Sequence, residues 1–247
     1  MFAHEKLQVY GKALAFNTKA AVWTGTWDKK HALVDHLSRA AESIVLNLAE
    51  AARQRGAPAR LRIVDYSIGS ALECAGCLDI ARIKDLLSNE HCDQEKQLLC
   101  EITKMLIGLR KAWAESIPRE EAPRYVSKSV NASSESLFHH EELEVYRMSL
   151  NFIKWFVSLP EGKELSSRLF RQMDEAATSM VLNIAEGNGR YAELDHRNFV
   201  QIAERAAVKA VVYLDLCEKR ALLLETEITS PKQILGRISA MLGGFYT

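Results

Sequence analysis

The chain has 247 residues, 48% of them hydrophobic and 26% charged, which is ordinary for a soluble globular protein. Its 32 basic and 32 acidic side chains cancel, so bulk charge cannot attract a polyanion and any nucleic acid would need a local basic patch. Five Cys without framework spacing, and no apolar run long enough for a signal peptide or membrane span, predict a cytoplasmic protein with no membrane partner.

The sequence contains two copies of one unit, and they align without a gap under a shift of 136 residues. The shift pairs the following stretches: Ser43–Glu50 with Ser179–Glu186, His4–Tyr10 with His140–Tyr146, and Lys96–Leu99 with Lys232–Leu235. A fixed register over more than a hundred residues indicates a tandem duplication. We therefore predict two domains, residues 1–116 and 139–247, each large enough to bury its own core.

Apolar residues at helical spacing predict four helices in the first copy, over residues 5–24, 29–55, 58–87 and 91–115. The second of these has a wide apolar stripe: Leu33, Leu37, Ala40, Ala41, Ile44, Leu48 and Ala51. Short connections between the helices predict antiparallel neighbours. The predicted fold class is therefore all-α, with two tandem up-and-down antiparallel four-helix bundles.

The second copy follows the same plan with local differences. Gly187, Asn188 and Gly189 loosen or end its second helix earlier than in the first copy, because Gly is a poor helix former. Its third helix is predicted over 194–224, and Thr229–Pro231 is predicted to open the fourth. Between the copies, two prolines and a Ser-rich run give residues 117–138 the composition of a linker.

The repeated Asn-x-Ala-Glu motif places two polar groups beside the apolar stripe of the second helix. Asn47 and Glu50, like Asn183 and Glu186, are three residues apart and share a helix face. We interpret them as structural, bonding across helices or to the backbone, with a ligand or RNA contact as the alternative. A lone carboxylate without a second acid, a His or a metal partner is not a catalytic arrangement, so no enzyme activity is predicted.

A basic cluster follows each motif. The predicted nucleic-acid-binding residues are Arg53, Arg55, Arg60 and Arg62 in the first copy, with Arg190 and Arg197 in the second. The planar fork of Arg suits pairs of phosphate oxygens. The alternative is a solvated corner in which these arginines pair with local acids.

Cys74 and Cys77 have the spacing of one cysteine pair of a four-Cys zinc site. Cys92 and Cys100 do not have the spacing of the second pair. Two Cys separated by three residues in a helix are more simply small core residues. No metal site and no cofactor are predicted.

Leu182–Gly187 followed by Gly189 and Arg190 resembles the signature of the four-helix-bundle proteins encoded by intervening sequences of bacterial 23S ribosomal RNA. Gly69–Glu73 resembles the third-helix motif of that family, and the opening Leu-x-Val-Tyr also fits. The family includes the accessory variability determinant of diversity-generating retroelements. The resemblance implies four-helix bundles in ring-shaped homo-oligomers and, for the retroelement members, binding of RNA and a reverse transcriptase.

These observations predict a non-enzymatic, oligomerising adaptor that binds structured RNA or an RNA-handling protein such as a reverse transcriptase. The alternative is a protein-interaction scaffold without nucleic-acid binding. Because the copies diverge directly after Glu50 and Glu186, their surfaces need not be interchangeable. We therefore expect copy one to meet copy two, within a chain or between chains of a homo-oligomer.

Overall fold

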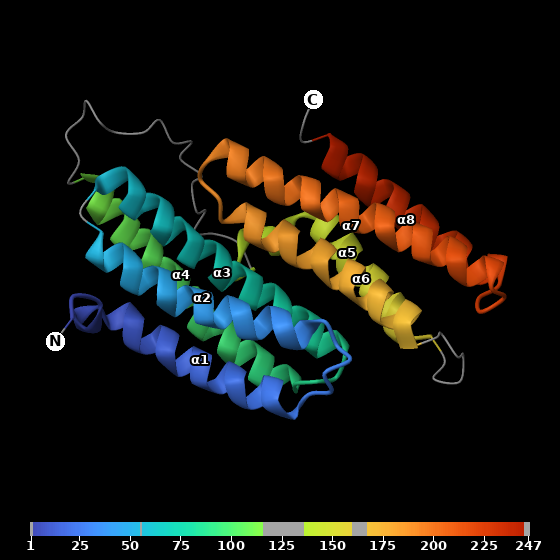
Figure 1. The fold of residues 1–247 in the computed structure, drawn as a ribbon, viewed down its shortest axis with the longest axis horizontal. Helices are drawn as coiled ribbons and strands as arrows, with labels where there is room; N and C mark the ends of the chain where they lie inside the picture. The colour runs from blue at the N-terminus through green and yellow to red at the C-terminus, as the bar shows by residue number, and fades with distance from the viewer. Residues whose placement is uncertain (1, 55, 116–135, 160–166, 245–247) are drawn as a thin grey trace.

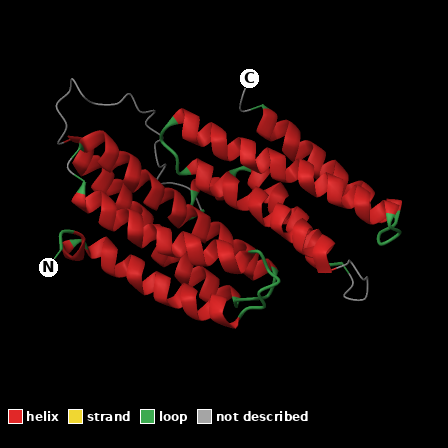
Figure 2. Cartoon of the chain, in the orientation of Figure 1, coloured by secondary structure: helices red, strands yellow, loops and turns green. Residues whose placement is uncertain are grey.

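The computed structural model describes the chain except for residues 1, 55, 116–135, 160–166 and 245–247. The described part is helical and contains no strand (Figures 1 and 2). Its α-helices are α1 (Gln8–Thr26), α2 (Leu33–Arg53), α3 (Ala57–Ile83), α4 (Asn89–Glu115), α5 (Glu144–Val157), α6 (Ser167–Asn188), α7 (Glu193–Lys219) and α8 (Glu225–Gly243). Two 3₁₀-helices, η1 (His4–Lys6) and η2 (His139–Glu142), precede α1 and α5.

Helices α1–α4 form one bundle and α5–α8 form the other (Figure 1). Within each bundle, consecutive helices pack against each other and the last helix packs against the first, as an up-and-down arrangement requires. The apolar stripe of α2 faces its core, since Leu33, Leu37, Ile44 and Leu48 are fully buried. The predicted fold class of two tandem all-α bundles is confirmed.

The third helix of each copy ends earlier than the sequence indicated. We expected α3 to reach residue 87 and α7 to reach 224, but they end at Ile83 and Lys219. Asp85 and Ala221, the same position in the two copies, adopt φ values of 53° and 54°. In this left-handed turn the next residue's N–H donates back to the helix, at 2.9 Å in both copies. A non-glycine residue in this conformation leaves little sequence signal.

The prediction that Thr229–Pro231 opens the last helix was wrong. Helix α8 already begins at Glu225, and Pro231 lies inside it. The carboxylate of Glu227 accepts the Leu224 N–H at 2.7 Å, which caps the helix one turn before the proline. By contrast, α6 does end one residue earlier than α2 under the 136-residue shift, as the glycines predicted.

Most of the predicted linker, residues 117–138, lies outside the described residues. Its last three residues are described, and Phe138 does not behave as linker. Its ring is 4% exposed and stacks on His140 with centroids 5.6 Å apart. The packing of the second copy therefore includes residues before 139.

The two bundles meet where α3 packs against α6 and α5, a contact that we call the joint. Glycines allow a close approach there. A Cβ on Gly76 would lie 3.1 Å from a methyl of Leu182, and one on Gly189 would lie 2.8 Å from a methyl of Leu72. Both leucines are buried, and the apolar core runs through the joint from one bundle to the other. The copies therefore meet within the chain.

Replacing Leu182 by Ala tests the contribution of the joint. Its side chain is 1% exposed in the joint, so we expect the free energy of unfolding to fall by about 2–5 kcal/mol. Leu224→Ala is the matched control, because that side chain is 66% exposed and its truncation should change stability by less than about 0.5 kcal/mol. Urea denaturation measures both, and equal effects would contradict the assignment.

Candidate functional site

The joint buries charged groups as well as apolar ones. Lys84, directly after the end of α3, pairs with Asp174 on α6, and their side chains are 3% and 2% exposed. Asp174 also accepts the Ala32 N–H at 3.0 Å. A buried pair of this kind adds little net stability, but losing one partner would leave an uncompensated charge. It therefore fixes how the bundles are aligned.

His36 on α2 connects the two copies through carboxylates on either side. Its Nδ1 lies 3.2 Å from Glu73 on α3, and its Nε2 lies 3.3 Å from Glu175 on α6. Burial disfavours the charged imidazole, but the hydrogen bonds to Glu175 and Glu73 outweigh this and raise the pKa of His36 to about 9. His36 is therefore a cation at neutral pH.

Arg190, predicted as a nucleic-acid contact, lies in the interior, which corrects that prediction. It is 6% exposed and pairs with Glu186 one helical turn earlier. Its guanidinium reaches into the first bundle, where it lies 4.9 Å from the ring centroid of Tyr66 and 3.4 Å from the Asp65 carbonyl oxygen. A Cβ on Gly69 would lie 2.9 Å from its Cζ, so the glycine makes room for it.

Glu186 is the acidic end of this network. Burial and the nearby Glu73 carboxylate raise its pKa to about 7, while Arg190 opposes the shift. Glu50, its counterpart in the first copy, is exposed instead. The same motif residue therefore has different surroundings in the two copies.

A second set of polar side chains in the joint surrounds Lys96, and we call it the Lys96 cluster. The ammonium of this α4 residue lies 2.6 Å from Asp79 and 2.5 Å from Glu141, and the Tyr146 hydroxyl donates to Asp79 at 2.8 Å. His140 is fully buried beside them, and burial lowers its pKa to about 3, so its imidazole is neutral.

Asp79, His140 and Glu141 have donor atoms within 4.8 Å of one another, which is compatible with a metal ion. However, the Lys96 ammonium already lies against both carboxylates and supplies the positive charge that they need. The chemistry of this cluster is therefore that of an ion-pair network within the joint.

The asparagines of the repeated motif have the same contacts in both copies. The amide nitrogen of Asn47 donates to the Ser43 carbonyl at 2.9 Å, and that of Asn183 donates to the Ser179 carbonyl at 2.7 Å. Each also reaches the hydroxyl of the same serine. The asparagines therefore bond within their own helix, one turn back, rather than across helices.

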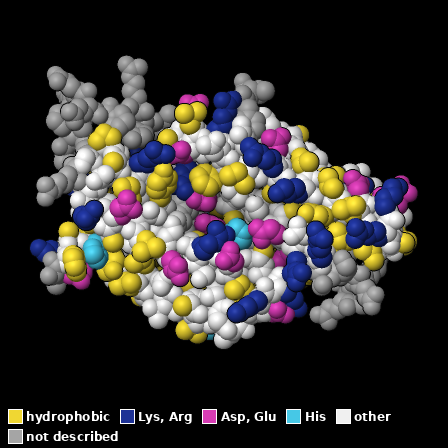
Figure 3. Space-filling view, viewed as in Figure 1, with side chains coloured by type: hydrophobic (Ala, Val, Ile, Leu, Met, Phe, Trp, Pro, Cys, Tyr) yellow, Lys and Arg dark blue, Asp and Glu magenta, His cyan; other side chains and the backbone are white. Residues whose placement is uncertain are grey.

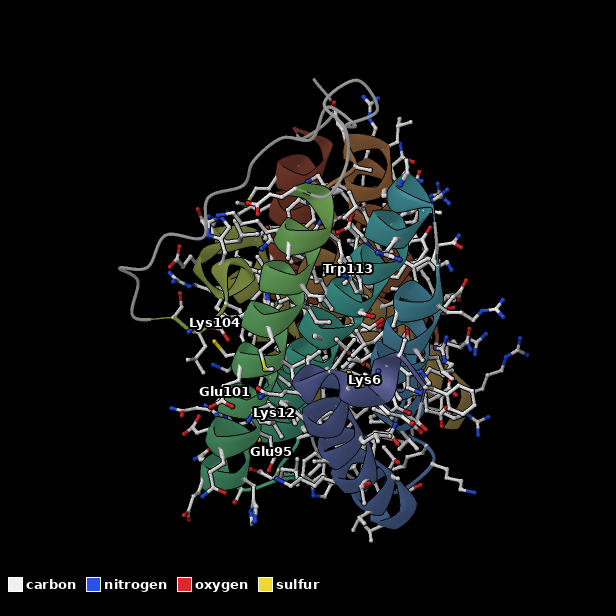
Figure 4. All side chains as sticks on the ribbon, turned by 90° about the vertical axis from the view of Figure 1, so that its left-hand side faces the viewer. Lys6, Lys12, Glu95, Glu101, Lys104 and Trp113 are labelled. Atoms are coloured by element: carbon white, nitrogen blue, oxygen red, sulfur yellow. The ribbon has the colours of Figure 1, made fainter. Side chains whose placement is uncertain are left out.

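Arg53, Arg60 and Arg62 lie around the turn from α2 to α3 and together form what we call the basic corner. Arg53 and Arg62 are exposed, whereas Arg60 is half-buried. Arg60 donates to the Gln54 carbonyl at 2.8 Å and lies 5.1 Å from the ring centroid of Trp113, which Figure 4 shows on the α3 side of α4. Within the described residues, none of the three forms an ion pair with a carboxylate.

The other predicted nucleic-acid contacts do not join this corner. Arg55 lies outside the described residues. Arg197 is exposed on the first turns of α7, in the second bundle. Neighbouring His196 contacts the Gly187 carbonyl oxygen at 2.8 Å through its Nδ1. The basic corner is therefore a feature of the first copy.

Cys74 and Cys77 are fully buried in α3, as expected for core residues. Burial raises the pKa of both thiols well above the ordinary value, so neither is a ready thiolate. These cysteines therefore pack in the apolar core and offer no nucleophile.

The fold and its paired motifs define an all-helical tandem-repeat protein. A family model described as 23S rRNA-intervening sequence protein matches residues 5–108 and again residues 141–244. The chain belongs to this family, as a tandem duplication of its unit. No curated protein and no solved structure matches it significantly. None of the described helices is both long and apolar enough to cross a membrane.

The high pKa of His36 predicts a pH-dependent stability. The folded state keeps a proton that the unfolded state loses from pH 6.5 upward, so stability falls as pH rises from about 6.5 to about 9. The loss attributable to His36 should approach about 3 kcal/mol. His36→Gln, which installs the residue found at the matching position 172, should flatten this slope in denaturation at pH 7–9.

His139→Gln is the control for this titration, because that side chain is exposed and lies outside the His36 network. It should retain the slope of the parent chain. A parent protein whose stability does not change between pH 7 and 9 would contradict the assignment of a charged His36.

Proposed function

We propose that the chain is a non-enzymatic adaptor that binds structured RNA through the basic corner. The observation that carries this proposal is a group of guanidinium groups around the start of α3, none of which forms an ion pair with a carboxylate among the described residues. Arg53 and Arg62 are exposed on either side of this helix terminus. The proposal uses the surface of the first copy, because Arg190 of the second is engaged in the joint.

The start of α3 is itself suited to an anion. Gly56 occupies the N-cap position and, within the described part of the chain, makes no side-chain cap hydrogen bond to the N–H groups of the first turn, where Pro58 has no N–H of its own. These groups and the helix dipole favour a negative charge at this end. A phosphate there would lie within reach of arginines that precede and follow the turn.

The corner is partly preorganised. Arg60 is held by the Gln54 carbonyl and by Trp113, so less of its side-chain freedom remains to be lost on binding. Arg62 lies over the ring of Tyr66, 5.8 Å from its centroid. Fixed guanidinium groups suit the backbone of a folded RNA, since double-stranded RNA is recognised largely through its shape and phosphates.

The buried acids of the joint support a role without catalysis. Asp174 and Asp79 each pair with a lysine, which leaves neither of them as a free base. The neutral net charge favours a second candidate, a protein-interaction scaffold whose partner is an RNA-handling protein such as a reverse transcriptase. The two candidates differ in whether the isolated chain binds RNA.

Reversing two charges tests the RNA proposal. Arg53→Glu combined with Arg62→Glu should weaken binding of a fluorescent RNA hairpin, measured by anisotropy over a salt series. Each lost phosphate contact should reduce the slope of log K against log salt by about 0.7–0.9. Both side chains are exposed, so the fold should be retained.

Lys29→Glu with Lys104→Glu is the control of equal charge. Both lysines are exposed, and Figure 4 shows Lys104 on the side of α4 away from Trp113. This control should bind the hairpin nearly as well as the parent chain. If the parent does not bind RNA at moderate salt, or if both variants lose binding equally, the scaffold function is favoured instead.

A further inference from the structure

A pocket lies between the two bundles, next to the joint. Its walls come from α3 and α4 of the first copy, from the residues that lead into η2, and from the end of α6 with the residues that follow it. Its volume is about 110 Å³, comparable with an engineered cavity of about 150 Å³ that holds benzene. The pocket is partly open to solvent, so a ligand can extend beyond it. We call it the joint pocket.

Most of the residues that line the joint pocket are apolar. Ile68 and Leu72 on α3 are 2% and 7% exposed, and Phe138 before η2 is 4% exposed. Ile107 on α4 and Leu137 also belong to this apolar lining. Walls of this kind bind the apolar body of a small ligand and remove it from water.

The ionisable side chains that line the joint pocket are basic. They are Lys104, His139 and Arg190, and no described Asp or Glu lies among them. A hollow beside α1 and α4 instead combines Lys19 with three acidic residues. Figure 3 likewise shows acidic and basic side chains interspersed over the visible face of the molecule. The joint pocket therefore favours a ligand with a negative charge.

Lys104 is the cation that such a ligand would meet. It lines the pocket and is exposed, so it lies at the mouth. Within the described part of the chain, it forms no ion pair. Arg190, by contrast, is already paired with Glu186. His139 contacts the Glu142 carboxylate at 3.2 Å.

A buried hydroxyl in the wall of the pocket has no partner. Thr103, directly before Lys104 on α4, is 8% exposed, and its Oγ1 makes no hydrogen bond to any described residue. Three other helical threonines, Thr18, Thr24 and Thr229, donate to the carbonyl one turn back. Buried polar groups are normally paired, because an unmade hydrogen bond costs free energy. A ligand oxygen that reached the Thr103 hydroxyl would satisfy it.

The wall of the pocket on α4 differs from the same part of the second copy. Lys104 and Ile107 match Ala240 and Gly243 under the 136-residue shift. The second copy therefore lacks both the cation and the apolar side chain one turn after it. The combination occurs in the copy whose α4 faces the pocket.

We propose that the joint pocket binds a small apolar carboxylate, with a body the size of one aromatic ring. The body lies between the apolar walls, and the carboxylate lies at the mouth between the Lys104 ammonium and the Thr103 hydroxyl. One ammonium and one hydroxyl match the two oxygens of a carboxylate. Because the walls come from both copies, a bound ligand would stabilise the joint. The proposal does not depend on RNA binding.

Phenylacetate is the probe for this site, with the isotope-labelled full chain observed by NMR. A ligand of about ten heavy atoms is expected to bind in the millimolar range or more tightly. The amide shifts should concentrate on lining residues such as Leu72, Thr103 and Ile107. Phenylacetamide, which has the same shape without the charge, should bind more weakly, and the cation phenethylamine more weakly still.

Substitutions on α4 test the two contacts of the carboxylate. Lys104→Gln should weaken phenylacetate binding about two- to fivefold and leave phenylacetamide binding unchanged, since it removes an exposed charge. Thr103→Val keeps the shape of the side chain, so it should weaken phenylacetate binding about tenfold or more without lowering the urea midpoint of the free protein. Lys111→Gln is the matched control, because Lys111 is exposed two turns further along α4 and does not line the pocket. It should bind phenylacetate as the parent does.

Filling the pocket gives a test that does not depend on charge. Ile107 is half-buried, and Ile107→Trp should occupy the space and abolish binding of both phenylacetate and phenylacetamide. Circular dichroism checks that this variant is folded as the parent is. Undiminished binding in Ile107→Trp would overturn the assignment of the pocket.

Three further results would overturn the proposal. Millimolar phenylacetate that shifts no lining amide would show that the pocket is closed or otherwise filled. Shifts scattered over exposed basic side chains would show non-specific binding of an anion only. Equal binding of phenylacetate and phenylacetamide to the parent would show that the site does not recognise a carboxylate.

Discussion

The close approach of α3 to α6 is the contact on which the rest of the structure depends. Gly76 and Gly189 remove the Cβ atoms that would hold these helices apart, and apolar side chains from both bundles fill the space. Dispersion attraction weakens steeply as side chains move apart, and a wider gap would expose apolar surface to water. The distance between α3 and α6 therefore decides whether the two cores join. The duplicated chain thereby becomes a single packed unit rather than two bundles on a tether.

The buried ion pairs give this contact its alignment. Lys84–Asp174 at one end and Arg190 at the other tie helices of both copies together, with His36 and the Lys96 cluster between them. Sliding α6 along α3 by one helical turn would separate these partners while they remain buried, which is expensive. An apolar contact alone would tolerate such a shift more easily.

The duplication, the helices and the apolar stripe of α2 could be predicted from the sequence, because each is a repeating pattern along the chain. It did not predict the helix ends at Asp85 and Ala221, since a left-handed turn without glycine has no local signature. It also assigned Arg190 to the surface. One signal in the sequence could have located it, a difference between the two copies. The first copy has Gly69 where the second has Arg205, and the Arg190 guanidinium lies in the space that this glycine leaves. The charge pairs between the copies join residues far apart in the chain and have no periodicity to detect.

Native-state hydrogen exchange tests the central claim, that both copies share one core through the joint. The account predicts that the slowest amides of α3 and of α6 exchange with the same free energy, equal to that of global unfolding. It also predicts that α5–α8 have no separate opening while α3 stays protected. Exchange of the whole second bundle at a markedly lower free energy than α3 would contradict the account.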